Sequence, residues 1–254
     1  MRIAIYPYKM GSKSARNLRD CFNALGHRAK LVRERGRYRP KPSHLILGWG
    51  NPRVPIWGAT DLNHPLSIGR AINKQTAYAH FIANNVPTLE VTVDHDKAKG
   101  WLAEGKRVVG RQVLDGARGR GIVLMSRPEE FVECPLYTKF KKSDREYRVH
   151  VVGGEVIDYL QKKRPNGAGE LVPIRSATNG WVYCRTDILP LPEQAAEAAI
   201  KAVAALGLNY GGVDILWGNK TGAKVLEVNT APGIEGEGVR KFAVGILNQY
   251  GGQI

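Results

Sequence analysis

The stretch Gly211-Gly-Val-Asp214-Ile-Leu-Trp217, followed by Val225-Leu-Glu227-Val-Asn229-Thr-Ala-Pro-Gly233, places acidic residues inside apolar runs that are typical of strands. An ionised carboxylate in such a run is costly to bury unless a cation or hydrogen-bond donors compensate it. Glu227 and Asn229 are two residues apart, so a strand directs both to the same face. Asp214 lies 13 residues before Glu227, across a polar segment that contains glycine. Two antiparallel strands would therefore bring three oxygen-bearing side chains together.

Oxygen ligands that include one or two carboxylates suit Mg²⁺ carrying substrate phosphates. The pattern therefore indicates a nucleotide–metal site formed by Asp214, Glu227 and Asn229. The alternative is a plain hairpin whose polar residues face solvent. Val225 and Glu227 would then share one face, and this mixture of apolar and acidic residues is unusual for a solvated face. Both interpretations stay open on this pattern alone.

Composition places the chain among ordinary globular proteins. It has 254 residues, 43% hydrophobic and 24% charged, which is enough for one large domain or two smaller ones. No apolar run approaches the roughly 20 residues of a membrane span, and the first apolar stretch is too short for a signal peptide. Three widely spaced cysteines (Cys21, Cys134 and Cys184) argue against a disulfide scaffold and a zinc site. We therefore expect a cytoplasmic protein that makes no membrane contact.

Positive charge is concentrated near the N-terminus. The formal net charge is +15, and residues 1–43 contain 12 Lys or Arg against Asp20 and Glu34. Such asymmetry favours an acidic partner, which could be nucleic acid, an acidic peptide or a phosphorylated ligand. The alternative is a basic solvated surface with no specific partner.

Periodicity predicts an α/β unit followed by α+β structure. A strand over 2–7, a helix over 12–25 with Ser12 or Ser14 as N-cap, and short strands over 29–32 and 45–47 indicate a small open α/β unit in residues 1–70. Further helices are expected over 74–84, 192–207 and 239–250. Short strands lie between the first two of these helices, so we expect α+β structure after residue 70.

Two glycine-containing segments invite comparison with phosphate-binding loops. Asp115-Gly116-Ala-Arg-Gly119-Arg120-Gly121 lies between two apolar runs, as a glycine flap over phosphates or a plain hairpin turn would. Gly100-Trp-Leu-Ala-Glu-Gly105-Lys106-Arg107 nearly spells a P-loop. We reject it because Arg107 replaces the hydroxyl residue that binds Mg²⁺ and the interior is typical of a helix.

Two further polar groups have both a functional and a structural explanation. Arg148 could clamp a phosphate or carboxylate through its fork of donors, or form a surface ion pair with Glu146. Arg175 and Asn179 form a polar cluster beside Trp181, where a turn explains Asn179 equally well.

Taken in order, these segments resemble the ATP-grasp carboxylate–amine ligases over about residues 70–250. The segments that show the resemblance are the helix from Asn73-Lys74, the flap 116–121, the run from Tyr147-Arg148 to Gly154, Asp214, and Glu227-Val-Asn229-Thr-Ala-Pro-Gly233. The resemblance is greatest to glutamate ligases that modify the acidic tail of a ribosomal protein and to small phage-encoded ATP-grasp proteins. It implies an ATP-grasp fold preceded by a small open α/β (pre-ATP-grasp) domain. The expected domains are 1–70, a lid subdomain over 71–135, and a C-terminal subdomain with the metal site over 136–254.

The resemblance also implies roles for individual residues. Asp214, Glu227 and Asn229 would hold Mg²⁺, or Mn²⁺ as an alternative, between the ATP phosphates. Arg148, Arg175 and Asn179 would lie near the acceptor and the γ-phosphate. The implied nucleotide-binding residues are Lys74, Arg111, Gly116, Gly119, Arg120, Gly121 and Lys139.

Two positions depart from the family pattern. The family usually has a lysine on the strand before the flap, whereas this chain has Arg111, one position away when the flap glycines are aligned. A shift of one residue reverses the face of a strand unless a bulge intervenes. The adenine hinge normally carries an acidic residue, and this chain has Tyr137-Thr-Lys139-Phe140 there.

The implied activity is ATP-dependent amide formation. A carboxylate substrate would attack the ATP γ-phosphate, and an amine substrate would then displace phosphate from the acyl phosphate. An acidic peptide or protein tail, steered by the basic N-terminal region, is a candidate substrate. The alternatives are a non-catalytic nucleic-acid-binding protein that uses residues 28–41, which the sequence favours less, and an ATP-grasp phosphotransferase.

Overall fold

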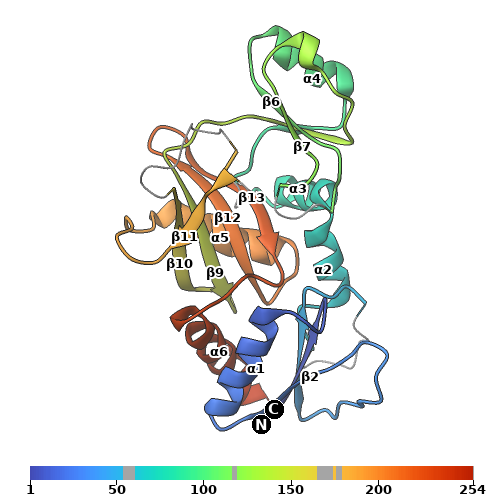
Figure 1. The fold of residues 1–254 in the computed structure, drawn as a ribbon, viewed down its shortest axis with the longest axis vertical. Helices are drawn as coiled ribbons and strands as arrows, with labels where there is room; N and C mark the ends of the chain where they lie inside the picture. The colour runs from blue at the N-terminus through green and yellow to red at the C-terminus, as the bar shows by residue number, and fades with distance from the viewer. Residues whose placement is uncertain (54–60, 116–118, 165–173, 176–178, 254) are drawn as a thin grey trace.

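A computed structural model describes residues 1–53, 61–115, 119–164, 174–175 and 179–253, which form three β-sheets along an elongated molecule (Figure 1). The first sheet is parallel, and the other two are antiparallel. The expected order, an α/β unit followed by α+β structure, is confirmed. Within the described residues, no helix combines the length and the apolar character needed to cross a membrane.

The N-terminal unit is a parallel sheet with the strand order β2-β1-β3-β4. Its strands are β1 (Arg2–Pro7), β2 (Arg28–Leu31), β3 (His44–Trp49) and β4 (Asp61–Leu62). Helix α1 (Lys13–Ala24) begins after Ser12, whose Oγ accepts a hydrogen bond from the Ala15 backbone N–H. Ser12, rather than Ser14, is therefore the N-cap. The buried residues of α1 (Ala15, Leu18 and Phe22) recur at helical spacing and pack against the sheet.

The second sheet has the strand order β5-β8-β6-β7 and forms the end of the molecule farthest from the termini (Figure 1). Its strands are β5 (Val91–Thr92), β6 (Val108–Arg111), β7 (Ile122–Met125) and β8 (Leu136–Lys139). Helix α4 (His95–Ala103) packs on one face through Ala98, Trp101 and Leu102. It covers Gly100–Ala103 of the segment that nearly spells a P-loop, so the interior of that segment is helical as expected.

The third sheet has the strand order β11-β10-β9-β12-β13. Its strands are β9 (Arg145–Val152), β10 (Glu155–Lys163), β11 (Val182–Cys184), β12 (Tyr210–Gly218) and β13 (Gly222–Asn229). Its apolar face packs on helices α2 (Pro65–Ile72), α3 (Lys74–Ala83) and α5 (Glu193–Ala205) in one core. Along β9, Tyr147, Val149 and Val151 point into this core. The alternate residues Glu146, Arg148 and His150 therefore lie on the opposite face.

Two features of the structure cross the expected domain boundaries, which remain a prediction. A boundary after residue 135 would cut through the second sheet, because β8 pairs with both β5 and β6. The N-terminal sheet also does not close its own core. Helix α6 (Glu237–Tyr250) returns from the C-terminal part and packs beside α1, with Phe242 and Ile246 in the same core as Ile3 and Ile5. The two chain ends consequently lie together (Figure 1).

Candidate functional site

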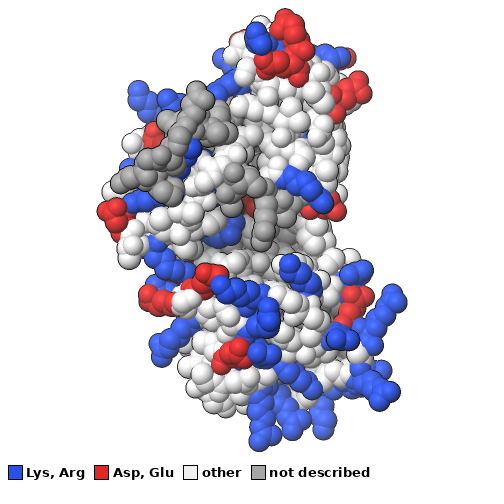
Figure 2. All heavy atoms as spheres, viewed as in Figure 1, with Lys and Arg blue, Asp and Glu red and all other residues white. Residues whose placement is uncertain are grey.

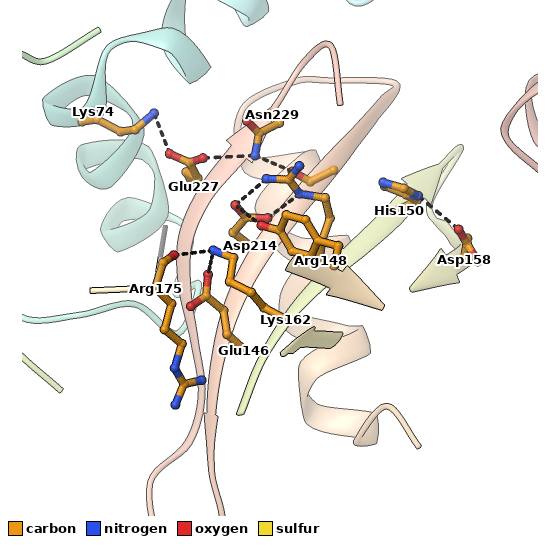
Figure 3. Close-up of polar contacts among 12 residues, drawn as sticks. Lys74, Glu146, Arg148, His150, Asp158, Lys162, Arg175, Asp214, Glu227 and Asn229 are labelled. Carbon is orange, nitrogen blue, oxygen red and sulfur yellow. Dashed lines mark hydrogen bonds and ion pairs between the residues drawn. The ribbon is translucent and has the colours of Figure 1, made fainter. Parts of the chain in front are cut away.

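Strands β12 and β13 place three oxygen-bearing side chains on one face of the third sheet. They pair antiparallel, with Asp214 opposite Glu227 and Gly212 opposite Asn229. Val213 and Val228, the alternate residues, are buried in the core on the other side. The antiparallel pairing expected from the sequence is thus confirmed. Figure 3 shows Asp214, Glu227 and Asn229 close together on this face.

Asp214 is held by Arg148 from the neighbouring strand. Strand β9 pairs with β12 so that Arg148 lies opposite Asp214, and the guanidinium donates two hydrogen bonds of 2.7 Å, from Nε to Oδ1 and from Nη2 to Oδ2. The Tyr183 hydroxyl donates a third, of 3.2 Å, to Oδ2, and the Tyr183 ring lies 4.3 Å from the Arg148 guanidinium carbon. A surface ion pair between Arg148 and Glu146 is therefore excluded as the explanation for Arg148.

The negative charge of Glu227 is compensated by Lys74, and Asn229 donates a hydrogen bond to the same carboxylate. Lys74, a buried residue in the first turn of α3, places its Nζ 3.1 Å from Glu227 Oε2. Asn229 Nδ2 donates a hydrogen bond of 3.1 Å to Glu227 Oε1. Burial would raise the pKa of Glu227, but Lys74, and then Arg148 and Arg111, lower it to about 2. The carboxylate therefore stays ionised at neutral pH.

Arg111 reaches this cluster from the second sheet. It influences the pKa of both Glu227 and Tyr78, whose buried hydroxyl lies beside it. Among the described residues, nothing accepts a hydrogen bond from its buried Nε. A buried donor without a partner is costly, so this atom is suited to a phosphate oxygen. The offset of Arg111 in the sequence thus does not turn it away from the site.

The arrangement fits a divalent cation accompanied by phosphates. Each carboxylate oxygen can accept two hydrogen bonds or metal bonds. Asp214 Oδ1 accepts one hydrogen bond, and each oxygen of Glu227 has one partner, so all three keep a free acceptor position. Two carboxylates face Lys74 and Arg148, so the cluster is close to neutral before any ligand binds. Among the described residues there is no group of three His, Cys, Asp or Glu that could hold a metal by protein ligands alone. The donor set therefore suits Mg²⁺ that brings its own phosphate oxygens.

The glycine flap connects β6 to β7 beside Arg111. Gly119 and Gly121 have φ of 81° and 71°, a conformation that side chains with a Cβ rarely adopt. The Gln112 N–H donates a hydrogen bond of 2.8 Å to the Gly121 carbonyl oxygen and closes the turn. Arg120 is exposed, and its Nη2 lies 3.9 Å from Asp115 Oδ1. Gly116 lies outside the described residues, and the binding role of the flap remains a prediction.

Lys139 is not brought to the cluster. On β8 it lies opposite Val108 of β6, which is buried in the core beneath α4. Its Nζ contacts Glu90 at 2.8 Å and lies 4.9 Å from the Trp101 ring. Arg111 lies opposite Leu136, so the period-two alternation of the strands puts Arg111 and Lys139 on opposite faces. Lys139 thus lies away from the carboxylate cluster, and its nucleotide-binding role remains a prediction.

In the described part of the chain, the side chains of Arg175 and Asn179 contact groups other than Asp214, Glu227 and Asn229. The Arg175 guanidinium extends away from Asp214 (Figure 3) and donates a hydrogen bond of 2.6 Å to the Ser143 carbonyl oxygen. Asn179 Nδ2 donates to the Ile174 carbonyl oxygen at 2.8 Å, a local contact of the kind a turn makes. Their catalytic roles therefore remain predictions, which require these side chains to move.

Three residues of the site were missed from the sequence. Glu146 and Lys162 form a buried ion pair, and Lys162 also donates a hydrogen bond of 2.7 Å to the Arg175 carbonyl oxygen. Lys162 of β10 lies opposite Tyr183 of β11. This pairing places the Tyr183 hydroxyl within hydrogen-bond distance of Asp214. The alternation of Glu146 and Arg148 with apolar residues pointed to this face, but no sequence signal linked Tyr183 to it.

Comparisons with known proteins agree with this geometry. The family description "RimK-like ATP-grasp domain" matches residues 114–246, more than half of the chain. A Coxiella burnetii (strain Dugway 5J108-111) protein named probable alpha-L-glutamate ligase is 26% identical over 279 residues, covering 93% of this chain and 89% of its own length.

Two solved structures share the fold. The ATP-grasp ligase PsnB, complexed with a variant of a minimal precursor, Mg and ADP, has a TM-score of 0.71 at 13% identity, covering 98% of each chain. A RimK domain protein ATP-grasp from Sphaerobacter thermophilus DSM 20745 has a TM-score of 0.66 at 18% identity, covering 98% of this chain and 99% of its own.

Proposed function

The chain belongs to the RimK-like ATP-grasp family, and from this membership we propose that it is an ATP-dependent ligase that joins a carboxylate to an amine. One observation of the structure carries the proposal. Asp214, Glu227 and Asn229 share one face of the sheet, and cations from three different elements surround them: Lys74, Arg111 and Arg148.

The reaction has two steps. A carboxylate oxygen attacks the γ-phosphorus of ATP, forming an acyl phosphate and releasing ADP. The amine nitrogen then attacks the acyl carbon, a C–N bond forms, the C–O bond to phosphate breaks, and the amine loses a proton. Negative charge gathers on phosphoryl oxygens in the first step and on the acyl oxygen in the second, so fixed cations lower both barriers.

The residues of the cluster have different roles in these two steps. Asp214, Glu227 and Asn229 would hold Mg²⁺, which would neutralise phosphate charge when it is bound. Arg111 offers its unpartnered Nε to a phosphate oxygen, and Lys74 places a second cation beside Glu227. Arg148 supplies the counter-charge to Asp214 and presents its guanidinium to the acceptor side of the cluster. Because Asp214 and Glu227 each have a cationic partner, we assign them as metal ligands and not as general bases.

We propose an acidic peptide or protein tail as a substrate, drawn in by the N-terminal unit. Figure 2 shows Lys and Arg side chains crowding the surface of this unit. Within the described part of the chain, no acidic side chain pairs with Arg2, Arg28, Lys30 or Lys41. Uncompensated charge of one sign raises the rate at which an oppositely charged partner arrives.

The free cysteines suit a reducing compartment, so we place the reaction in the cytoplasm.

The same uncompensated cations support one alternative, a protein that binds nucleic acid without catalysis. Such a protein would bind RNA or DNA with steep salt dependence and would not need nucleotide. An ATP-grasp phosphotransferase, the other alternative, would release ADP without any amine.

The test is release of ADP and phosphate from Mg·ATP, with a panel of carboxylates and amines that includes L-glutamate and acidic peptides. We expect full turnover only when a carboxylate and an amine are both present, together with a new amide detected by mass spectrometry. Asp214→Asn should abolish it. Undiminished turnover of Asp214→Asn, or release of ADP that ignores the amine, would contradict the proposal.

A further inference from the structure

A buried tyrosine of α3 lies beside Arg111 at the edge of the carboxylate cluster. Tyr78 follows Lys74 by one turn of the helix, so the two side chains project from the same face. Lys74 reaches Glu227 from this face (Figure 3), with Nζ 3.1 Å from Oε2. Tyr78 itself is only 1% exposed, so its hydroxyl ends inside the protein.

Strand β6 directs Arg111 toward α3. A Cβ built at Gly110 would lie 2.7 Å from Cys134 Sγ, in the core beneath α4, so the neighbouring Arg111 points to the other face of the second sheet. The chain then continues to Leu114, whose carbonyl oxygen accepts a hydrogen bond of 3.0 Å from the Lys74 N–H at the start of α3. This contact holds the segment after Arg111 against the helix that carries Tyr78.

Thr88 fixes a second hydroxyl to strand β13. It forms an isolated β-bridge with Val225, and its Oγ1 donates a hydrogen bond of 2.9 Å to the Val225 carbonyl oxygen. Val225 precedes Glu227 by two residues on the same strand. A hydroxyl that donates its proton keeps two lone pairs, so Thr88 Oγ1 can still accept a hydrogen bond.

The Tyr78 hydroxyl faces both of these groups. Burial raises the pKa of its phenol, whereas the charge of Arg111 and the nearness of Thr88 lower it, so both side chains lie close to the hydroxyl. No described residue forms a well-aligned hydrogen bond with Tyr78 Oη or with Arg111 Nε, and both atoms are buried. Buried polar atoms without a partner are costly. Two of them beside each other indicate that a ligand completes the arrangement.

We propose that Tyr78 is a positioning residue for Arg111 in nucleotide binding. When Arg111 Nε donates to a phosphate oxygen of ATP, another N–H of the same guanidinium donates to Tyr78 Oη. The Tyr78 hydroxyl donates in turn to Thr88 Oγ1, which is bonded to β13. This chain of hydrogen bonds fixes a cation of the second sheet to the strand that carries Glu227. The inference rests on the proposed function through its use of ATP and does not depend on which carboxylate or amine reacts.

The geometry of arginine gives this anchor its effect. The guanidinium is a planar, rigid fork with five N–H donors, so holding one donor sets the direction of the others. The long side chain that carries it loses rotamer freedom when it is fixed. A hydroxyl that fixes the guanidinium before ATP arrives therefore reduces the cost of binding the phosphate.

The test measures the affinity of the full-length chain for the non-hydrolysable ATP analogue AMP-PNP with Mg²⁺, by isothermal titration calorimetry. Tyr78→Phe removes the hydroxyl and keeps the ring in the core, and it should weaken binding about tenfold. In an Arg111→Gln background the same substitution should have almost no effect, because the side chain that Tyr78 positions is absent. Tyr147→Phe is the matched control. Tyr147 is buried in the same core and donates its hydroxyl to the Pro190 carbonyl oxygen, so this variant should bind like the wild type.

A second readout separates positioning from a merely structural role. Tyr78→Phe removes a buried hydroxyl that has no well-aligned partner, so urea unfolding without nucleotide should show an unchanged or slightly higher free energy of unfolding. In turnover, the KM for ATP should rise while the KM values for the carboxylate and the amine stay the same.

Either of two results would overturn the inference. One is wild-type affinity of Tyr78→Phe for AMP-PNP. The other is an equal loss of affinity on Tyr78→Phe in the wild-type and Arg111→Gln backgrounds, which would mean that the hydroxyl acts independently of Arg111. Neither measurement needs turnover. A wild-type protein that binds AMP-PNP and forms no amide would contradict the ligase reaction alone, so the two failures are distinguishable.

Discussion

Arg148 and Asp214 lie opposite each other on adjacent antiparallel strands and are joined by two hydrogen bonds of 2.7 Å. Their side chains are 15% and 7% exposed, so the pair is largely shielded from water. Breaking such a pair leaves an uncompensated charge in a poorly solvated place. The pair therefore serves the fold as well as the site.

This geometry predicts a coupled loss of stability. Arg148→Gln and Asp214→Asn should each lower the free energy of unfolding by about 3 kcal/mol, because each leaves one partner without its counter-charge. The double variant should lose clearly less than the sum of the two, as measured by urea unfolding. Strict additivity would mean that the two side chains do not interact in solution.

The near-neutral cluster predicts that metal and nucleotide bind together. Mg²⁺ alone should bind weakly, because Lys74 and Arg148 already neutralise Glu227 and Asp214. A non-hydrolysable ATP analogue should raise the affinity for Mg²⁺ strongly in the wild type. Glu227→Gln should lose most of that gain and lower the turnover rate by about 100-fold or more, since even partners of metal ligands cost 10–100-fold. Mn²⁺ should replace Mg²⁺ in the same titration.

The opposite placement of Arg111 and Lys139 predicts opposite effects on ATP binding. Arg111→Gln removes a buried donor beside Glu227 and should raise the KM for ATP about tenfold or more. Arg111→Lys keeps the charge and should recover part of this loss. Lys139→Gln should leave the KM for ATP nearly unchanged, because Lys139 contacts Glu90 on the other face of the sheet. Equal effects of Arg111→Gln and Lys139→Gln on the KM for ATP would show that the second sheet is oriented differently relative to the nucleotide.

Glu146 predicts a specific dependence of stability on pH. Burial raises its pKa to about 6, Lys162 opposes this, and Asp214 adds to it. The folded protein then binds a proton more tightly than the unfolded chain, whose pKa is near the ordinary 4.5. Stability from this group is therefore present below pH 4.5 and declines, by about 2 kcal/mol in all, as the pH rises through 6. Glu146→Gln should remove this decline, measured as the difference in urea stability between wild type and variant from pH 4.5 to 7.

The basic N-terminal surface predicts salt-dependent capture of acidic substrates. The double variant Lys30→Glu, Lys41→Glu should raise the KM for an acidic peptide and flatten its dependence on salt. The KM for a neutral acceptor should not change. If the variant instead loses affinity for RNA while its kinetics with acidic peptides stay the same, the surface serves nucleic acid.

Local pattern was sufficient for much of the fold. The helices beginning near residues 13, 74 and 193 follow from apolar residues at helical spacing and from cap or proline signals at their starts. Helix α2 (Pro65–Ile72) was not among the helices expected from the sequence. Its N-cap is His64, which is not among the usual N-cap residues.

The identity of each side chain fixes the chemistry available at its position. Asp214, Glu227 and Asn229 were identified because charge inside an apolar run needs compensation, and because alternation along one strand is a local property. The partners that supply the compensation were decided only by the tertiary structure. Arg148 pairs with Asp214, 66 residues away, and not with nearby Glu146, because the register between β9 and β12 selects its neighbour. Similarly, Asp158 meets Lys241 only because α6 returns across the sheet. Cross-strand register and helix docking are non-local, so no short stretch of sequence contains them.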